Sequence, residues 1–324
     1  MPSIYLHNYF SKDIYKQLNK EKVIIPNDPT YFLIFSQSFD YLFSYNNFKL
    51  KKGKDIRKLS HYAHTHKVKE YFKNIITYIK DNQLYDDGNI GYLYGSLSHY
   101  ALDSTFHPYV HYISGRFTKL DKKNTKKYQG KHAINEIMLD SIYYYKDHDK
   151  KYYKYKLYND LFPKIKPENN LIKNIDNAFI NTFNYKDIGN KYFDSYNQCY
   201  YIYRYLMYDR FNIKKFTYKI VDFFTPFKNF KSYSYSHHIN KPNYDLLNND
   251  HKVWLHPVTG EKHTESVDEL YEIAMKKVLS FIKVCNKYFN NKCSLEEVEK
   301  VIGNISYSSG LDCEERAVFK YFSY

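Results

Sequence analysis

Histidine and aspartate recur at four-residue intervals in one segment of the chain, and this spacing gathers them on one face only if the segment is a helix. The residues are His99, Asp103, His107 and His111. In an α-helix, side chains four positions apart lie one above another. We therefore predict a helix with one polar stripe and apolar flanks. Pro108 is expected to kink or end that helix near His107, because the residue before a proline avoids helical backbone angles.

A low content of turn-forming residues extends the helical prediction to the rest of the chain. Only 10 Gly and 9 Pro occur in 324 residues, which speaks against a turn-rich all-β sandwich or barrel. The length is ample to bury a core, and no stretch resembles a linker. We predict a single all-α domain over residues 1–324, with metal-ligand segments within 1–140, aromatic-rich helices in 141–224, a long loop in 225–265 and C-terminal helices in 266–324.

Two kinds of local pattern locate individual helices. Apolar residues recur at helical spacing in 170–184 and 193–224, which predicts helices whose apolar faces lie in the core. Ser266 and Ser294 are each followed three positions later by a glutamate. This capping box predicts that a helix starts at each of the two serines.

A second histidine–carboxylate pair suggests a metal site. His132 and Glu136 also lie four residues apart. A single pair of this kind is more often a surface pair or a helix cap. Imidazole and carboxylate groups together nevertheless suit zinc as ligands. A site built only from them that leaves one position open for water is typical of catalytic zinc. Several histidines and carboxylates on polar stripes would be a costly way to build a core without a metal. The two segments together therefore predict metal binding.

Further candidate ligands lie upstream. His7 follows a short N-terminal stretch, and Asp40 is a lone carboxylate among aromatic residues. Three more histidines, His61, His64 and His66, precede a helical pattern. Taken singly, each histidine is more often a solvent-facing or capping residue than a ligand. A buried Asp40 would need a partner, and a metal would serve.

The charge and the cysteines limit the classes of partner and compartment. There are 49 Lys and Arg against 35 Asp and Glu, a net charge of +14. Such a field attracts nucleic acid or an acidic membrane surface, although codon bias in an AT-rich genome gives the same composition. Four cysteines without a CxxC pair fit a reducing compartment. With no signal peptide and no apolar run of about 18 residues, we expect a cytoplasmic protein.

Read in chain order, the candidates resemble the ligands of the zinc-dependent phospholipase C family, which includes bacterial phospholipases C and the single-strand nucleases of fungi and plants. The stretch GSLSHYALDSTFHP, Gly95–Pro108, is similar to the central helix of that family. The later stretch WLHPVTGE, Trp254–Glu261, resembles its uncharacterised intracellular bacterial members. The resemblance covers roughly residues 1–290.

The resemblance implies an all-α fold with a cluster of two or three Zn²⁺ ions at one end of a cleft. Carried over residue by residue, the resemblance implies three sets of ligands. The first ion would be held by Asp40, His64, His99 and Asp103, and the second by His107, His132 and Glu136. The third would be held by His7, the N-terminal backbone and Asp103, which would bridge two ions. Asp40 would also act as the general base. The third set depends on removal of Met1, which Pro2 permits.

Two of these assignments have a neighbouring alternative. The secreted relatives place six residues between the bridging aspartate and the next histidine, whereas Asp103 and His107 are four apart. We choose His107 because a proline follows it, with His111 as its substitute. We choose His64 over His66 from its place at the head of the helical pattern.

The resulting hypothesis is a zinc-dependent phosphoric-ester hydrolase, most simply a phospholipase C-like enzyme that uses zinc-activated water on an anionic phosphate ester. An intracellular enzyme of this kind would work at the inner leaflet of an anionic membrane. A nuclease acting on single-stranded nucleic acid is the alternative enzyme, and a metal-stabilised basic binding module is the alternative without turnover. No protein partner is inferred. The basic loop 115–131 would border the cleft, and the loop 225–265 would cover it.

Overall fold

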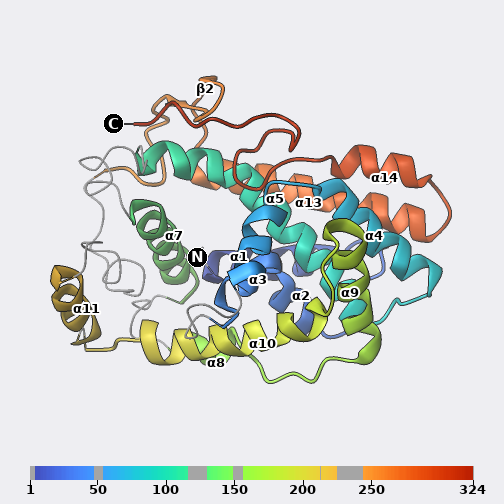
Figure 1. The fold of residues 1–324 in the computed structure, drawn as a ribbon. Coiled ribbons are helices and arrows are strands. Elements are labelled where there is room, and N and C mark those ends of the chain that lie inside the picture. The colour runs from blue at the N-terminus through green and yellow to red at the C-terminus, as the bar shows by residue number, and fades with distance from the viewer. Residues whose placement is uncertain are drawn as a thin grey trace.

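A buried helix, α5 (Asp87–Ser114), is the axis of the fold (Figure 1). The computed structural model describes residues 4–46, 54–115, 130–148, 156–211, 213–224 and 244–323. Asp86 caps the helix by accepting a hydrogen bond from the Asn89 backbone N–H at 2.9 Å. The helix continues through Pro108, so the expectation that it ends there is wrong. Tertiary contacts on almost every face outweigh the hydrogen bond that proline removes.

Four helices make the most extensive contacts with α5. They are α1 (Ile4–Leu18), α2 (Thr30–Phe35), α7 (Lys131–His148) and α13 (Val267–Phe289). The approach of α2 is especially close, because α5 presents glycine to it. A methyl group at Gly95 would lie only 2.5 Å from the Phe32 carbonyl oxygen.

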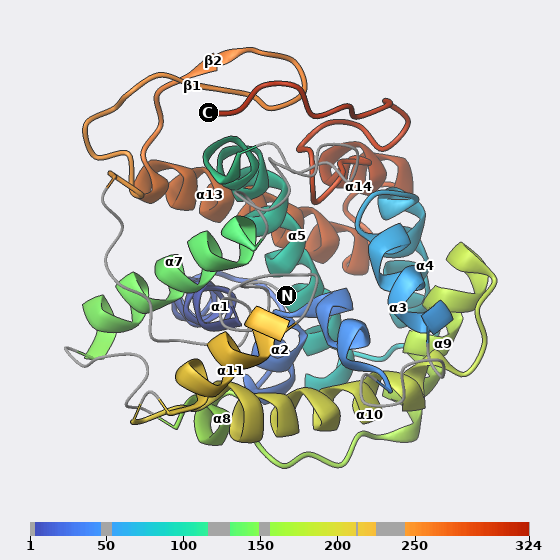
Figure 2. The same cartoon turned by 60° about the vertical axis from the view of Figure 1, so that its left-hand side comes forward.

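The remaining elements surround this centre (Figure 2). They are η1 (Ser38–Ser44), α3 (Lys54–Ala63), α4 (Val68–Asp81), α8 (Leu157–Asp160), α9 (Asn169–Phe183), α10 (Ile188–Tyr201), η3 (Ile202–Met207), α11 (Ile213–Phe224) and α14 (Leu295–Ile302). A single short hairpin pairs β1 (Trp254–Leu255) with β2 (Lys262–His263), antiparallel, with Trp254 opposite His263. The described chain is thus helical with almost no strand, which confirms the all-α prediction.

Both predicted capping boxes are present. The Ser266 and Ser294 side chains accept hydrogen bonds from the backbone N–H of Glu269 and Glu297 at the starts of α13 and α14. Within the described residues, no helix is both long and apolar enough to cross a membrane. The division into one domain over residues 1–324 stays a prediction.

The expectation of core-facing helices throughout 193–224 is wrong in its second half. Helix α10 buries its apolar face and continues into η3, a π-helical stretch, but the chain then leaves the helical path and resumes as α11. The apolar residues of α11 point outward instead of into the core. Periodicity predicts that a face is apolar, but it does not say what covers that face.

Candidate metal centre

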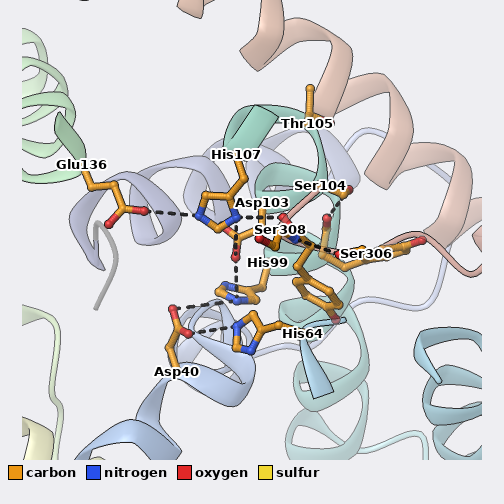
Figure 3. A network of polar contacts seen from close by, with 12 residues as sticks. Asp40, His64, His99, Asp103, Ser104, Thr105, His107, Glu136, Ser306 and Ser308 are labelled. Atoms are coloured by element: carbon orange, nitrogen blue, oxygen red, sulfur yellow. Dashed lines mark hydrogen bonds and ion pairs between the residues drawn. The ribbon is translucent and has the colours of Figure 1, made fainter. Parts of the chain in front are cut away.

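The predicted ligands come together as three adjoining groups. Oxygen and imidazole nitrogen atoms lie within 4.8 Å of one another inside each group. The groups are His7, His99 and Asp103; Asp40, His64 and His99; and His107, His132 and Glu136. They are drawn from α1, η1, the end of α3, α5 and α7, and Figure 3 shows the central members turned toward one another. His99 belongs to the first two groups, and Asp103 Oδ2 lies 3.7 Å from Nδ1 of His107 in the third, so the three groups adjoin one another.

Asp40 and Asp103 hold the first two groups together. The Asp40 Oδ1 atom lies 3.0 Å from His64 Nε2, and its Oδ2 atom lies 3.9 Å from His99 Nε2. Asp103 contacts His99 Nε2 at 3.2 Å through Oδ2 and His7 Nε2 at 3.1 Å through Oδ1. Each carboxylate therefore lies between two imidazoles, as a bridging ligand does.

Glu136 joins the two histidines of the third group. Its Oε1 atom lies 3.0 Å from His132 Nε2 and 3.3 Å from His107 Nε2. The interval of four residues between His132 and Glu136 on α7, and between Asp103 and His107 on α5, produces this arrangement. The two helical stripes thus face each other, and each has the shared face that its spacing predicted.

Three of the histidines are oriented by backbone carbonyls. Nδ1 of His64 is 2.7 Å from Ser60 O, Nδ1 of His99 is 3.0 Å from Ser36 O, and Nδ1 of His107 is 2.8 Å from Tyr307 O. A carbonyl oxygen can only accept, so Nδ1 donates and carries the proton. Each ring then directs Nε2 into the centre, which is the outer-sphere pattern that orients metal-bound histidines.

Several buried atoms at the centre lack a hydrogen-bond partner among the described residues. They include His99 Nε2, Asp40 Oδ2 and Asp103 Oδ2. An unpaired polar atom costs on the order of 1–3 kcal/mol when it is buried, and more when it is charged. Bound cations would coordinate such atoms, so the donor set fits zinc.

The centre has strongly perturbed pKa values. Burial lowers the pKa of His99 to about 4, against the raising effect of Asp103. Burial also opposes protonation of His107, but the charges of Asp103 and Glu136 raise its pKa to about 10. Nearby histidines hold the pKa of Asp103 and of Glu136 well below the ordinary values, despite burial. The two carboxylates are therefore ionised at neutral pH and attract cations.

A cleft of about 280 Å³ opens directly onto the centre. Its lining includes Asp40 and Glu136, together with Phe43, His61 and Ser308. The cleft is large enough for a small phosphate ester, and its walls combine an aromatic ring with polar groups. Substrate-sized space thus adjoins the residues predicted to hold the metal.

The structure distinguishes the neighbouring alternatives. His64 lies in the centre, whereas His66 is exposed and stacks on Tyr62 with ring centroids 4.1 Å apart. His107 is a member of the third group, whereas His111 borders the cleft and contacts Ser308 Oγ at 3.2 Å. The geometry favours the chosen residue in both cases, and the ligand role of each stays a prediction.

Other site predictions concern residues outside the described ranges. Pro2, most of the basic loop at 116–129, and the first part of the long loop at 225–243 lie there. In the described part of that loop, His256 Nε2 donates to Ser309 O at 2.9 Å, and His263 Nδ1 lies 3.3 Å from a carboxylate oxygen of Glu265. His256 therefore contacts the C-terminal part of the chain, and His263 contacts a residue of its own loop. Neither histidine is a member of the three groups.

Two supporting features escaped the sequence analysis. Asp140 on α7 accepts hydrogen bonds from the Tyr5 and Leu6 backbone N–H groups at 3.1 and 2.8 Å, which fixes the start of α1 just before His7. The sequence does indicate that Asp140 lies on the same helix face as Glu136, because it follows Glu136 by four residues. The C-terminal strap, residues 303–313, supplies the Tyr307 carbonyl to His107, and its Tyr307 N–H donates to His64 O at 2.9 Å. No side-chain pattern marks such backbone contacts.

Comparison with known proteins identifies a related family. A family model described as zinc dependent phospholipase C matches residues 6–189. The matched range contains every member of the three groups and ends before the C-terminal strap. No curated protein and no solved structure matches the chain.

Proposed function

The chain belongs to the zinc-dependent phospholipase C family, and on that premise we propose that it cleaves the phosphodiester bond of a phospholipid by zinc-assisted hydrolysis. The observation that carries the proposal is the meeting of three donor groups beside one cleft, with buried donor atoms that lack hydrogen-bond partners. The proposed ligands are Asp40, His64, His99 and Asp103 for one ion, His107, His132 and Glu136 for a second, and His7 with Asp103 for a third.

When bound, zinc lowers the pKa of a coordinated water toward ~7 and neutralises the charge that develops on the phosphoryl group. The chain's own residues orient the reactants. Asp40 borders the cleft and leaves Oδ2 without a hydrogen-bond partner among the described residues, so this oxygen can accept a proton from an attacking water. The carbonyls of Ser36, Ser60 and Tyr307 hold the histidine rings in one orientation during the reaction.

The proposal is tested by assaying the purified full chain on phosphatidylcholine, phosphatidylglycerol and single-stranded DNA, with Asp40→Asn as the variant. We expect phospholipid cleavage to a diacylglycerol and a phosphorylated head group, with turnover reduced at least ~100-fold in the variant. Asp245→Asn, a change far along the sequence and outside the three groups, is the control and should keep full turnover. Cleavage of DNA with both lipids left intact would contradict the phospholipase assignment and favour the nuclease. A protein that binds zinc but cleaves neither substrate would support a binding module.

A further inference from the structure

Helix α11 presents its apolar side to the outside of the molecule. Figure 1 shows it at the edge of the fold. Its outward side chains are between 47% and 80% exposed, and they are Ile213, Phe216, Ile220, Phe223 and Phe224. Their spacing of three and four residues places them on one face. An ordinary surface helix has the opposite orientation, with its apolar face buried.

The inward side of α11 is polar and is held by specific hydrogen bonds. Lys214 Nζ donates to the carbonyl oxygens of Tyr205 and Tyr208 at 2.7 and 2.6 Å. The Tyr218 hydroxyl donates to Leu206 O at 2.9 Å, and Asp222 is buried on the same side. These contacts fix the rotation of the helix about its axis. The exposure of the apolar face therefore follows from defined contacts of the opposite face.

The residues just before α11 enlarge the same apolar and aromatic area. Tyr201 and Tyr205 are exposed and stack with ring centroids 6.1 Å apart, and Phe211 is 74% exposed. The guanidinium of Arg204 lies 5.1 Å from the Tyr205 ring centroid. Exposed tyrosines beside a basic side chain are typical of protein surfaces that lie at the headgroup level of a bilayer.

Charge in this region favours an anionic partner. Residues 201–224 contain five basic and two acidic side chains. Both acids, Asp209 and Asp222, are buried, whereas Arg204, Arg210 and Lys219 are exposed. Among the described residues of 201–224, the surface therefore offers a strip of apolar residues with cations beside it and no exposed acid. That combination matches a bilayer with anionic headgroups, where apolar residues enter the acyl boundary and cations meet phosphates.

We infer that this area, the α11 surface, docks the protein onto anionic membranes. It comprises Tyr201, Tyr205, Phe211, Ile213, Phe216, Ile220, Phe223 and Phe224. The inference deepens the proposed function, because it gives a phospholipid-cleaving enzyme its contact with the lipid surface, but the docking itself needs no turnover. A bilayer suits the area better than a second copy of the chain, because a symmetric contact would bring like charges together.

The test measures co-sedimentation of the full chain with sucrose-loaded vesicles of phosphatidylcholine alone or with 30% phosphatidylglycerol, in the presence of EDTA so that lipid is not consumed. The variant is the double substitution Phe216→Ser and Phe223→Ser, and the control is Ile273→Ser, an exposed apolar residue of α13. We expect binding to the anionic vesicles and a loss of roughly tenfold or more in the double variant. Ile273→Ser should bind like the unchanged chain.

Three results would overturn the inference. One is equal vesicle binding by the double variant and the unchanged chain. Another is a dimer of the unchanged chain, seen by analytical ultracentrifugation, that the double variant converts to a monomer, which would make the area a contact between copies. The third is a lowered melting temperature in the double variant without a change in vesicle binding, which would mean that the chain itself covers the area.

A separate assay without EDTA distinguishes this inference from the proposed function. If the chain cleaves lipid but the double variant does so equally well on vesicles and on a monomeric short-chain phospholipid, the docking surface is wrong and the activity stands. If the chain binds anionic vesicles through α11 but cleaves no lipid, the activity is wrong and the docking surface stands. If both are right, the double variant loses turnover on vesicles and keeps it on the monomeric lipid.

Discussion

At the residue scale, the centre depends on histidines whose two ring nitrogens have different partners. In His64, His99 and His107, Nδ1 donates to a backbone carbonyl and Nε2 faces the carboxylates. A side chain fixed in this way loses little freedom on binding a metal. The chain's own backbone therefore sets the orientation of these three rings.

Glu136 is the residue whose loss removes the carboxylate that the two histidines of the third group share. Replacing it by Gln removes the oxygen charge shared by His107 and His132 while keeping the shape of the side chain. Glu136→Gln is expected to bind about one zinc fewer per chain than the unchanged protein. Elemental analysis of the dialysed protein measures this number. Glu261→Gln, an exposed glutamate, is the control, and an equal zinc content in all three proteins would exclude Glu136 as a ligand.

Lys277 gives a pH dependence that is independent of any metal. Its ammonium group donates to Ser104 Oγ at 2.8 Å, and burial lowers its pKa from 10.5 to about 8. The unfolded chain therefore binds this proton more tightly than the folded chain does. The cost to stability is complete below pH 8 and disappears as pH rises from about 8 to 10.5.

Lys277→Met is accordingly expected to raise the free energy of unfolding at pH 7 by about 1–2 kcal/mol, a value reduced from the full pKa shift because the side chain keeps some contact with water. The gain should shrink toward zero by pH 10. Urea denaturation at a series of pH values measures it, and Lys276→Met, its exposed neighbour, is the control. A gain that does not depend on pH would show that Lys277 is not a titrating buried group.

At the element scale, the contact between α2 and α5 fixes the distance between a carbonyl and a ligand. Ser36 directly follows α2, and its carbonyl holds His99 of α5. The helices approach closely because a side chain at Gly91 or Gly95 would collide with α2. Packing between two helices thus sets the orientation of a side chain at the centre.

Gly95→Ala is expected to destabilise the fold by about 1–3 kcal/mol through this collision and to weaken zinc binding, because it separates Ser36 from His99. Gly88→Ala is the matched control in the first turn of the same helix, where the added methyl group meets nothing nearer than 3.2 Å. Thermal unfolding and zinc titration measure both variants. Equal behaviour of the two variants would show that the close approach of α2 does not organise the centre.

The two helical stripes were predictable because all of their information is local. The interval of four residues between His99, Asp103 and His107, and between His132 and Glu136, predicts a shared face, and the structure has that face. His7 and Asp40 were candidates from their surroundings in the sequence, but only the family resemblance gave them definite ligand roles, since a lone histidine or aspartate carries little local signal. The carbonyl partners could not be predicted, because any residue has a carbonyl and only tertiary packing selects one.

The same limit explains the error at α11. Its alternation of apolar and polar residues correctly predicts a helix with one apolar face. Which face meets the protein is decided by Lys214 and Tyr218, whose hydrogen bonds reach carbonyls in and beside η3. Those carbonyls are available only where the chain turns after η3. The orientation of α11 therefore follows from the three-dimensional structure and could not be predicted from the apolar spacing of its sequence.

At the scale of the whole molecule, the centre needs a part of the chain beyond the range that matches the family model. Residues 6–189 contain the three donor groups, but α13 packs along α5, and the C-terminal strap contacts His64 and His107. A chain that ends at residue 224 would therefore expose one side of α5 and leave the Nδ1 atom of His107 without its carbonyl. We expect such a chain to lack cooperative thermal unfolding and to bind less zinc than the full chain. Equal zinc content and a sharp transition would show that the C-terminal part is dispensable.

Zinc content of the full chain tests the central claim most directly. Elemental analysis on untagged protein with its natural N-terminus, purified in zinc-supplemented buffer and then dialysed, gives the number of ions per chain. Two or three ions are expected from the three donor groups, and the number should fall in His99→Ala, because His99 belongs to two of them. Three ions would place His7 and the N-terminus in the centre. A protein without zinc would contradict the metal centre and the hydrolysis that depends on it.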